Sequence, residues 1–201
     1  MTEPTPLERL ARPVARQAVS DLDDVRAAQA DRRAFDRLYQ RYLQRVYSYA
    51  FYQLGDHHDA EDVTERTFLS ALAALDRFED EGGGFRAWLF RIAHNHIVSA
   101  QRSRSRRRTE PIDDAGQQAS PQADPAGIVA RADEVDQLRH ALARLPVDRR
   151  QVVVLRFVDE LTAREIGLVL GRSEGAVRVL LHRALSDLAV ALGHDRGARR
   201  P

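Results

Sequence analysis

The chain has 201 residues, with 31 basic and 30 acidic side chains that leave a formal charge of +1. This length fits one or two small domains and excludes a large barrel or a doubly wound enzyme. Cysteine is absent, which excludes disulfides, thiolate catalysis and Cys-ligated zinc. No apolar stretch approaches the roughly 18 residues of a transmembrane helix, and the first twenty residues lack a signal-peptide core. We therefore expect a soluble, cytoplasmic protein.

Helical spacing of apolar residues is widespread, and strand-like alternation is nearly absent. Apolar side chains from Phe35 to Ala50 recur at steps of three and four, which predicts one buried helix face. Further helices are predicted over residues 60–78 and 85–101, with the glycines of 82–84 in the loop between them. The sequence predicts an all-α protein.

Charge and composition divide the chain into segments. Five arginines fall within residues 102–108, and residues 109–130 are rich in Pro, Gly, Gln, Ser and Asp, as in a linker. We predict two small helical domains, 21–108 and 131–193, joined by this flexible linker. An N-terminal extension (1–20) and a basic tail (194–201) complete the chain.

The sharpest local pattern lies in the second domain. Thr162 stands three residues before Glu165, the spacing of a capping box, and Gly171 ends that short helix. Ser173 can cap the helix that follows. This arrangement is typical of a helix-turn-helix, whose second helix enters the major groove. The alternative is an ordinary pair of helices with a solvated arginine face.

A second pattern follows the three glycines. Trp88, the only tryptophan, is flanked by Arg86 and Arg91, and Asn95 lies one turn after Arg91. Aromatic and arginine side chains beside a flexible loop suit unpaired nucleotides, because bases stack while arginine holds phosphate. On spacing alone, however, Trp88 also fits a normal core stripe. The arginine run that follows fits a nucleic-acid backbone or a solvated segment.

The acidic stretch that begins at His57 permits two interpretations. His57, His58 and Asp59 invite a metal site, but neighbouring helical side chains point about 100° apart, so one metal would rarely take both histidines. Acidic residues at a helix start favour the macrodipole and present a docking surface for a basic partner. We expect no metal, no cofactor and no catalytic residue.

Taken together, these stretches resemble the extracytoplasmic-function (ECF) sigma factors, the small two-domain class of bacterial sigma factors. Residues 59–63 with 67–69 are similar to the core-polymerase-binding motif of region 2, and residues 85–95 to its helix that separates strands and reads the −10 element. Residues 145–184 are similar to region 4, which reads the −35 element. Glu65 and Arg66 depart from the usual Gln-Glu, and Gly167 from the usual Ala.

The resemblance implies a promoter-specificity subunit of RNA polymerase and three sets of site residues. Those implied for docking on the clamp coiled coil of core polymerase are Asp59, Glu61, Asp62, Glu65 and Arg66. Those implied for binding and melting the −10 element are Gly83, Gly84, Phe85, Arg86, Trp88, Arg91, Asn95 and Arg102. Those implied for the −35 element are Arg172, Ser173, Glu174, Arg178, Val179, His182 and Arg183.

The implied partners are core RNA polymerase, through its clamp and flap, and promoter DNA, both as duplex and as the non-template single strand. Members of the family are often held inactive by an anti-sigma factor, which is therefore a further candidate partner. The main alternative is a two-domain helix-turn-helix regulator that binds duplex DNA and never melts it. A metal hydrolase built on His57, His58 and Asp59 is a third hypothesis, although these residues lack a spaced ligand set.

Overall fold

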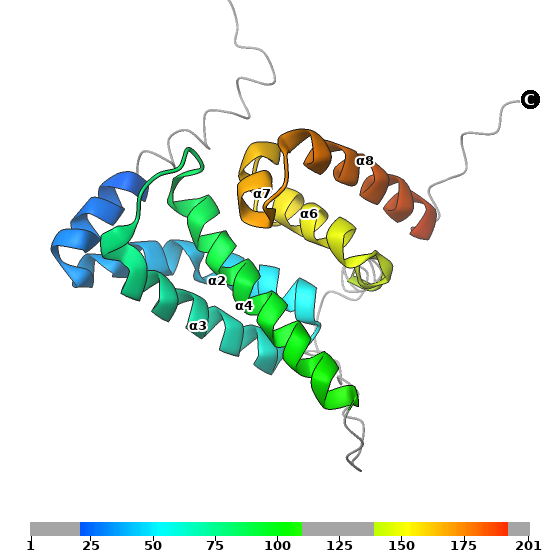
Figure 1. The fold of residues 1–201 in the computed structure, drawn as a ribbon, viewed down its shortest axis with the longest axis horizontal. Helices are drawn as coiled ribbons and strands as arrows, with labels where there is room; N and C mark the ends of the chain where they lie inside the picture. The colour runs from blue at the N-terminus through cyan, green and yellow to red at the C-terminus, as the bar shows by residue number, and fades with distance from the viewer. Residues whose placement is uncertain (1–20, 110–138, 193–201) are drawn as a thin grey trace, which may run out of the picture.

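The computed structural model describes residues 21–109 and 139–192 of the chain, with side chains up to residue 106 in the first range (Figure 1). Every regular element in these two ranges is helical, so the all-α prediction is confirmed. Within the same ranges, no helix has both the length and the apolar character needed to cross a membrane. The predicted N-terminal extension, basic tail and nearly all of the predicted linker lie outside the described residues.

The first domain is built on three long helices. Residues 21–30 form a helix that leads through the 3-10 turn η1 (Arg32–Ala34) into α2 (Phe35–Leu54). α3 (His57–Ala74) and the 3-10 turn η2 (Leu75–Arg77) follow, and a loop then leads into α4 (Gly84–Thr109).

Local chemistry sets the ends of these helices. α2 ends at Gly55, whose φ of 71° lies in the left-handed region that favours glycine. The Asp56 side chain then accepts a hydrogen bond from the Asp59 backbone N–H at 2.9 Å. This cap starts α3 three residues earlier than the apolar pattern predicted. α4 runs well past residue 101, because arginine is a good helix former and the basic run continues the helix.

Aromatic side chains fill the core of this domain. The fully buried Tyr42 packs on Phe85, with ring centroids 5.8 Å apart, and Tyr49 packs on Phe90 at 5.7 Å. These pairs join α2 to the first half of α4 and thereby fix the position of the loop that precedes α4.

The second domain comprises a helix over residues 139–144, then α6 (Val147–Phe157), α7 (Ala163–Leu170) and α8 (Glu174–Ala191). The capping box of Thr162 and Glu165 is present, with Thr162 N–H donating to Glu165 Oε2 at 2.7 Å. Gly171 adopts a left-handed φ of 64°, and Ser173 caps α8. The predicted helix-turn-helix is therefore formed by α7 and α8.

The two domains contact each other, which the sequence did not predict. α7 lies against the N-terminal half of α4, and α6 approaches α2 (Figure 1). Leu161, in the loop between α6 and α7, is fully buried. The helix-turn-helix therefore packs on the first domain through its first helix, and its second helix faces away.

Candidate partner-binding and nucleic-acid-binding surfaces

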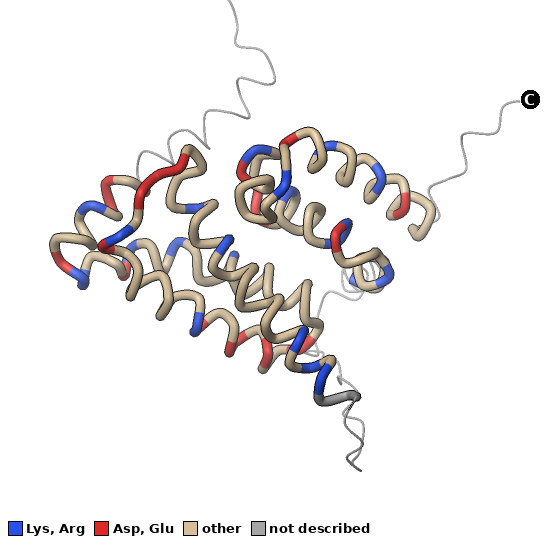
Figure 2. Tube along the Cα trace, in the orientation of Figure 1, with Lys and Arg blue, Asp and Glu red and all other residues tan. Residues whose placement is uncertain are grey.

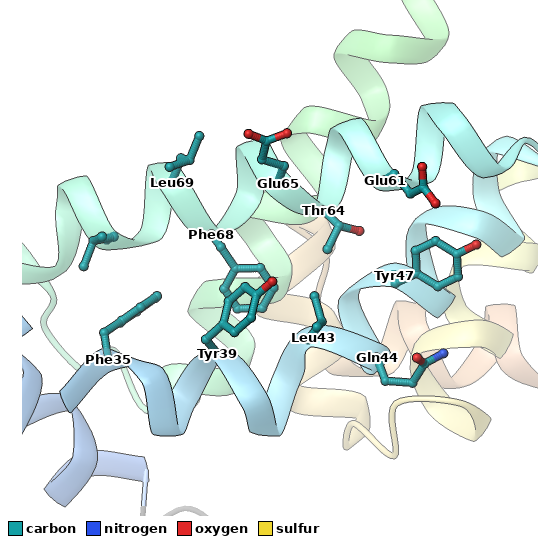
Figure 3. Close-up of a pocket in the computed structure, with 11 residues that line it drawn as sticks. Phe35, Tyr39, Leu43, Gln44, Tyr47, Glu61, Thr64, Glu65, Phe68 and Leu69 are labelled. Atoms are coloured by element: carbon teal, nitrogen blue, oxygen red, sulfur yellow. The ribbon is translucent and has the colours of Figure 1, made fainter. Parts of the chain in front are cut away.

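An apolar groove of about 680 Å³ runs between α2 and α3 (Figure 3). Phe68 forms part of its wall and meets Tyr39 edge to face, with ring centroids 4.8 Å apart. Leu69 is 59% exposed and Tyr39 is 38% exposed, although both are large apolar side chains. Exposed apolar side chains gathered in one groove are typical of a surface that a partner covers.

Glu61 and Glu65, two of the predicted docking residues, line this groove. They lie four residues apart, so they share one face of α3. The side chain of Glu61 is 66% exposed and lies 3.9 Å from His58. The groove therefore combines an apolar wall with two carboxylates, which suits a partner carrying apolar and basic side chains.

The other predicted docking residues lie on a different face of α3. Asp59, Asp62 and Arg66 line a polar cleft of about 310 Å³ between α3 and the second half of α4. Asp59 lies 3.6 Å from Arg104, and Asp62 lies 3.9 Å from Arg66. Figure 2 shows acidic positions at the start of α3 beside basic positions near the end of α4. The predicted docking set is thus divided between two surfaces, and this second one is partly neutralised.

The histidines at the start of α3 have structural partners. His57 stacks on Phe51, with ring centroids 4.4 Å apart, and its Nδ1 lies 2.5 Å from the Tyr47 hydroxyl. His58 faces Glu61 instead. Over residues 21–109 and 139–192, no group of three or more metal-binding side chains converges. The arrangement thus gives His57 a packing role in the first domain.

The loop before α4 is organised by Asp80. Its Oδ1 accepts hydrogen bonds from the backbone N–H groups of Gly82, at 2.8 Å, and Gly84, at 2.7 Å. Both glycines have left-handed φ values, 88° and 67°, which other residues rarely adopt. The triple glycine is therefore held in a defined turn by a single carboxylate.

Four of the predicted −10 residues form one stripe along α4. At 100° per residue, Trp88, Arg91, Asn95 and Arg102 fall within an arc of about 60°. Arg91, Asn95 and Arg102 are exposed, and Trp88 is half-buried against Phe78, with ring centroids 5.1 Å apart. Glu81 lies 3.5 Å from Arg91. The stripe thus pairs one aromatic side chain with two cations, as a surface for unpaired nucleotides requires.

Two other predicted −10 residues are buried. Phe85 is fully buried in the core, where it packs on Tyr42 and Phe78. Arg86 projects from the opposite side of α4 to Trp88 and is 5% exposed, because α7 covers it. A DNA contact for either side chain stays a prediction, and Phe85 already has a clear role in packing.

All seven predicted −35 residues lie at the surface of the helix-turn-helix. They are Arg172, Ser173, Glu174, Arg178, Val179, His182 and Arg183. Glu174 pairs with Arg178 one turn later, and Arg172 reaches Asp148 at 2.5 Å. Val179 is 50% exposed. The outer face of α8 therefore presents an apolar contact between polar and basic groups, which suits base edges in a major groove.

The presence of glycine at position 167 has a steric explanation that the helix pattern did not reveal. A Cβ added there would lie 2.6 Å from the carbonyl oxygen of Arg172, in the turn between α7 and α8. The Gly167 carbonyl also accepts the Arg172 N–H at 2.9 Å. In this chain the turn approaches α7 too closely for a side chain at residue 167.

Residues 67–69 fall in the predicted docking motif, but sequence reasoning missed the rest of the apolar wall of the groove. Tyr39, Leu43 and Tyr47 on α2 and Leu72 on α3 line it beside the acidic residues. The periodicity of α2 by itself predicts that Tyr39 belongs to the buried stripe, because it lies four residues after Phe35. These residues could have been found from the second apolar face of α2. A helix that packs on the core through one face needs apolar residues on that face alone, so a second apolar face indicates another contact surface.

Comparison with known protein families gives two matches that fall on the two domains. The Sigma-70 region 2 family matches residues 38–107, and the Sigma-70 region 4 family matches residues 136–188. The first contains most of the groove and the whole α4 stripe, and the second contains the helix-turn-helix.

Individual relatives agree with these matches. The chain is 35% identical to the ECF RNA polymerase sigma factor BldN of Streptomyces coelicolor over 178 residues, which covers 87% of this chain and 65% of BldN. It is 36% identical over 138 residues to the ECF RNA polymerase sigma factor ShbA of Streptomyces griseus, covering 67% of this chain and 72% of ShbA. With BldN and with SigD of Mycobacterium bovis, the match spans only 65% and 61% of the relative's length.

A solved structure shows the same arrangement of helices. CnrH, in complex with the cytosolic domain of CnrY, superposes with a TM-score of 0.65 at 26% identity, covering 87% of this chain and 98% of CnrH. The two family matches, the relatives and the fold agree. The chain belongs to the ECF RNA polymerase sigma factors of the sigma-70 family.

Proposed function

We propose that this chain binds core RNA polymerase and directs it to specific promoters. In this proposal the first domain docks on the polymerase and opens the −10 element, and the second domain reads the −35 element. The observation that carries it is the coexistence of three surfaces in one sigma-family chain. They are an apolar groove with acidic residues that no described residue covers, an aromatic and arginine stripe, and an exposed helix-turn-helix face.

The groove is the proposed docking surface for the clamp coiled coil. Leu69 and Tyr39 supply apolar area that no described part of this chain covers, and Glu61 and Glu65 supply charge for a basic partner. Apolar burial provides affinity, and charge complementarity orients the encounter. Asp59, Asp62 and Arg66 lie on the neighbouring cleft, where they would contact the partner only if it wraps around α3.

The α4 stripe is the proposed site for the opened −10 strand. An unstacked base costs a few kcal/mol, which stacking on Trp88 and contacts from Arg91 and Arg102 would offset. Asn95 lies between the two arginines and offers both a donor and an acceptor to a base edge. Arg178 and Arg183 would read the −35 duplex, where arginine pairs bidentately with guanine.

A duplex-binding regulator that never melts DNA is less well supported. It would need α8, but it would need neither the groove between α2 and α3 nor the Trp88 stripe. The proposal includes a cytoplasmic location and no catalytic role. An anti-sigma factor is a second proposed partner of the same chain, by analogy with CnrH, which was solved with CnrY.

Size-exclusion chromatography with bacterial core RNA polymerase tests the proposal. We expect one-to-one co-elution, lost when Glu61→Arg and Asp62→Arg are combined. The matched control combines Asp23→Arg and Asp76→Arg, which reverse two similarly exposed acids elsewhere on the first domain. Loss of binding in both double variants, or in neither, would contradict docking through the acidic end of α3.

A further inference from the structure

We propose that a cavity between the end of α2 and the start of the second domain binds a small phosphate monoester with an apolar or aromatic body. The cavity has a volume of about 350 Å³ and lies where α6 approaches α2 (Figure 1). Its walls come from the last turn of α2, the start of α3, the helix over residues 139–144 and α6. Volumes of about 300–1,000 Å³ are typical of small-molecule sites. The groove, the α4 stripe and the outer face of α8 lie elsewhere, so this site goes beyond the proposed function.

The described lining of the cavity carries cations and no carboxylate. Arg139 and Arg150 contribute two permanent positive charges, and His57 and His140 add two imidazoles. The planar fork of arginine pairs bidentately with phosphate oxygens. A phosphate monoester carries a charge of about −1.5 to −2 near pH 7. One such group therefore balances the two guanidinium groups.

Arg150 is the cation that most clearly lacks a counter-ion. The residue is half-buried, and its Nε is shielded from water without a hydrogen-bond partner among the described residues. Burial lowers the pKa of the Arg150 guanidinium, and no described carboxylate opposes this effect. Buried charges in proteins are ordinarily paired or hydrogen-bonded. An anion in the cavity would supply the missing partner.

Gln53 places a second unsatisfied group at the cavity. The residue is 3% exposed, and neither the Oε1 nor the Nε2 of its side chain has a partner among the described residues. Buried amides are ordinarily hydrogen-bonded, because an unpaired one loses its contacts with water and gains none. The Gln53 amide can both donate and accept, so a hydroxyl or a ring nitrogen of a ligand is a suitable partner.

Aromatic and apolar side chains form another wall of the cavity. His57 stacks on Phe51, and Arg139 Cζ lies 5.9 Å from the centroid of the same ring. This cation–π contact holds the Arg139 guanidinium beside the cavity. Tyr52 and Leu54, both half-buried, line the cavity next to Phe51. Apolar area beside the cations favours a phosphate with an organic body over phosphate alone.

The carbonyl end of α2 does not account for Arg150. Cations are favourable at the C-terminus of a helix, where backbone carbonyls lack partners. The Phe51 carbonyl, however, accepts the Gly55 N–H at 2.8 Å. The Leu54 carbonyl accepts a hydrogen bond from Arg104 Nη1 of α4 at 3.2 Å. These carbonyls are thus satisfied by other donors, and the charge of Arg150 is left for a ligand.

Isothermal titration calorimetry of the full chain with phenyl phosphate tests the site. We expect saturable one-to-one binding at physiological ionic strength. Inorganic phosphate should bind more weakly because it cannot use the apolar wall, and phenyl sulfate should bind more weakly because it has a similar shape but a single charge. Absence of phenyl phosphate binding, or binding no tighter than that of phenyl sulfate, would overturn the proposal.

Two arginine variants test whether the ligand lies in this cavity. Arg150→Gln and Arg139→Gln each remove one guanidinium and should weaken phenyl phosphate binding about tenfold or more. Arg139 lies in the first turn of a short helix, so Arg139→Gln keeps the test valid if Arg150→Gln does not fold. Thermal melting followed by circular dichroism reports the folding of each variant.

A matched control separates the cavity from general attraction of anions to arginine. Arg144 is exposed on the same short helix as Arg139 and lies outside the cavity lining. Arg144→Gln should leave the affinity for phenyl phosphate unchanged. Equal losses in this control and in the cavity variants would overturn the site, as would unchanged affinity in Arg139→Gln.

Acidic residues of the chain itself are the competing source of an anion. The stretch 110–138 ends next to Arg139 and contains Asp133, Glu134 and Asp136. Combining Asp133→Asn, Glu134→Gln and Asp136→Asn should leave the affinity for phenyl phosphate unchanged. Binding that appears only in this neutralised chain would assign the cavity to the chain's own carboxylates and overturn the proposal.

Two further ligands distinguish the sources of a phosphate monoester. Adenosine monophosphate represents a nucleotide and glucose 6-phosphate a sugar phosphate, and failure of both to bind would overturn the assigned class. These titrations need neither polymerase nor DNA. A failed titration therefore leaves the proposed function intact, and a chain that does not bind core polymerase can still bind the phosphate.

Discussion

Truncation of Leu69 gives the most quantitative test of the groove between α2 and α3. Full burial of a leucine side chain contributes about 1.5–3 kcal/mol. Leu69 is 59% exposed in the free chain, so a partner that covers it gains about 0.9–1.8 kcal/mol from the remaining area. Leu69→Ala should therefore weaken binding to core polymerase about five- to twentyfold. Biolayer interferometry on immobilised core polymerase measures this change directly.

A matched control excludes a general effect on stability. Val190, near the end of α8, is 61% exposed, which is close to the exposed fraction of Leu69. Its truncation to Ala also removes exposed apolar side-chain area. Val190→Ala should leave the affinity for core polymerase unchanged, while both variants shift thermal unfolding only slightly. Unchanged affinity in Leu69→Ala, or equal losses in the two variants, would refute docking through the groove.

Three further predictions concern the loop, the stripe and the helix-turn-helix. Asp80→Ala should lower the free energy of unfolding by about 1 kcal/mol and speed amide exchange at Gly82 and Gly84, because it removes the carboxylate that accepts their N–H groups. Unchanged exchange would contradict the role of Asp80 in holding the loop. Trp88→Ala should keep duplex binding but abolish promoter opening in permanganate footprinting, and an unchanged footprint would exclude Trp88 from melting. Gly167→Ala should lower the free energy of unfolding, measured by urea denaturation, by about 1 kcal/mol, because an overpacking cost of about 1–3 kcal/mol exceeds the helix-propensity gain of about 1 kcal/mol. A stabilised variant would contradict the close approach of the Arg172 carbonyl to residue 167.

Local signals in the sequence were sufficient for the helix-turn-helix. Thr162, Glu165, Gly171 and Ser173 each act through hydrogen bonds or φ angles within a few residues. Their roles therefore depend on nearby sequence and were predicted from it. The all-α class followed in the same way, because helical periodicity is also a local property.

The faces of helices were harder to predict than their existence. In the sequence, residues 59–66 form one continuous charged motif. A helix turns 100° per residue, however, so the side chains of this motif are divided between the groove and the cleft. Which face is covered depends on the neighbouring helices, which a single sequence does not display. The same reason explains Phe85, which fits a DNA-stacking aromatic by position and is buried by packing.

The contact between the domains was outside the reach of sequence patterns. Arg86 and Glu165 are 79 residues apart, and no periodicity links them. Glu165 was assigned only to its capping box, yet its carboxylate both caps α7 and pairs with Arg86. Long-range ion pairs of this kind depend on the packing of whole domains, so only the three-dimensional structure reveals them.

Transcription of fragmented bacterial genomic DNA by core polymerase, with and without this chain, tests the central claim most directly. Sequencing of the RNA 5′ ends should reveal start sites that appear only when the chain is present and that share two upstream sequence elements. An identical set of RNA 5′ ends with and without the chain would contradict the account.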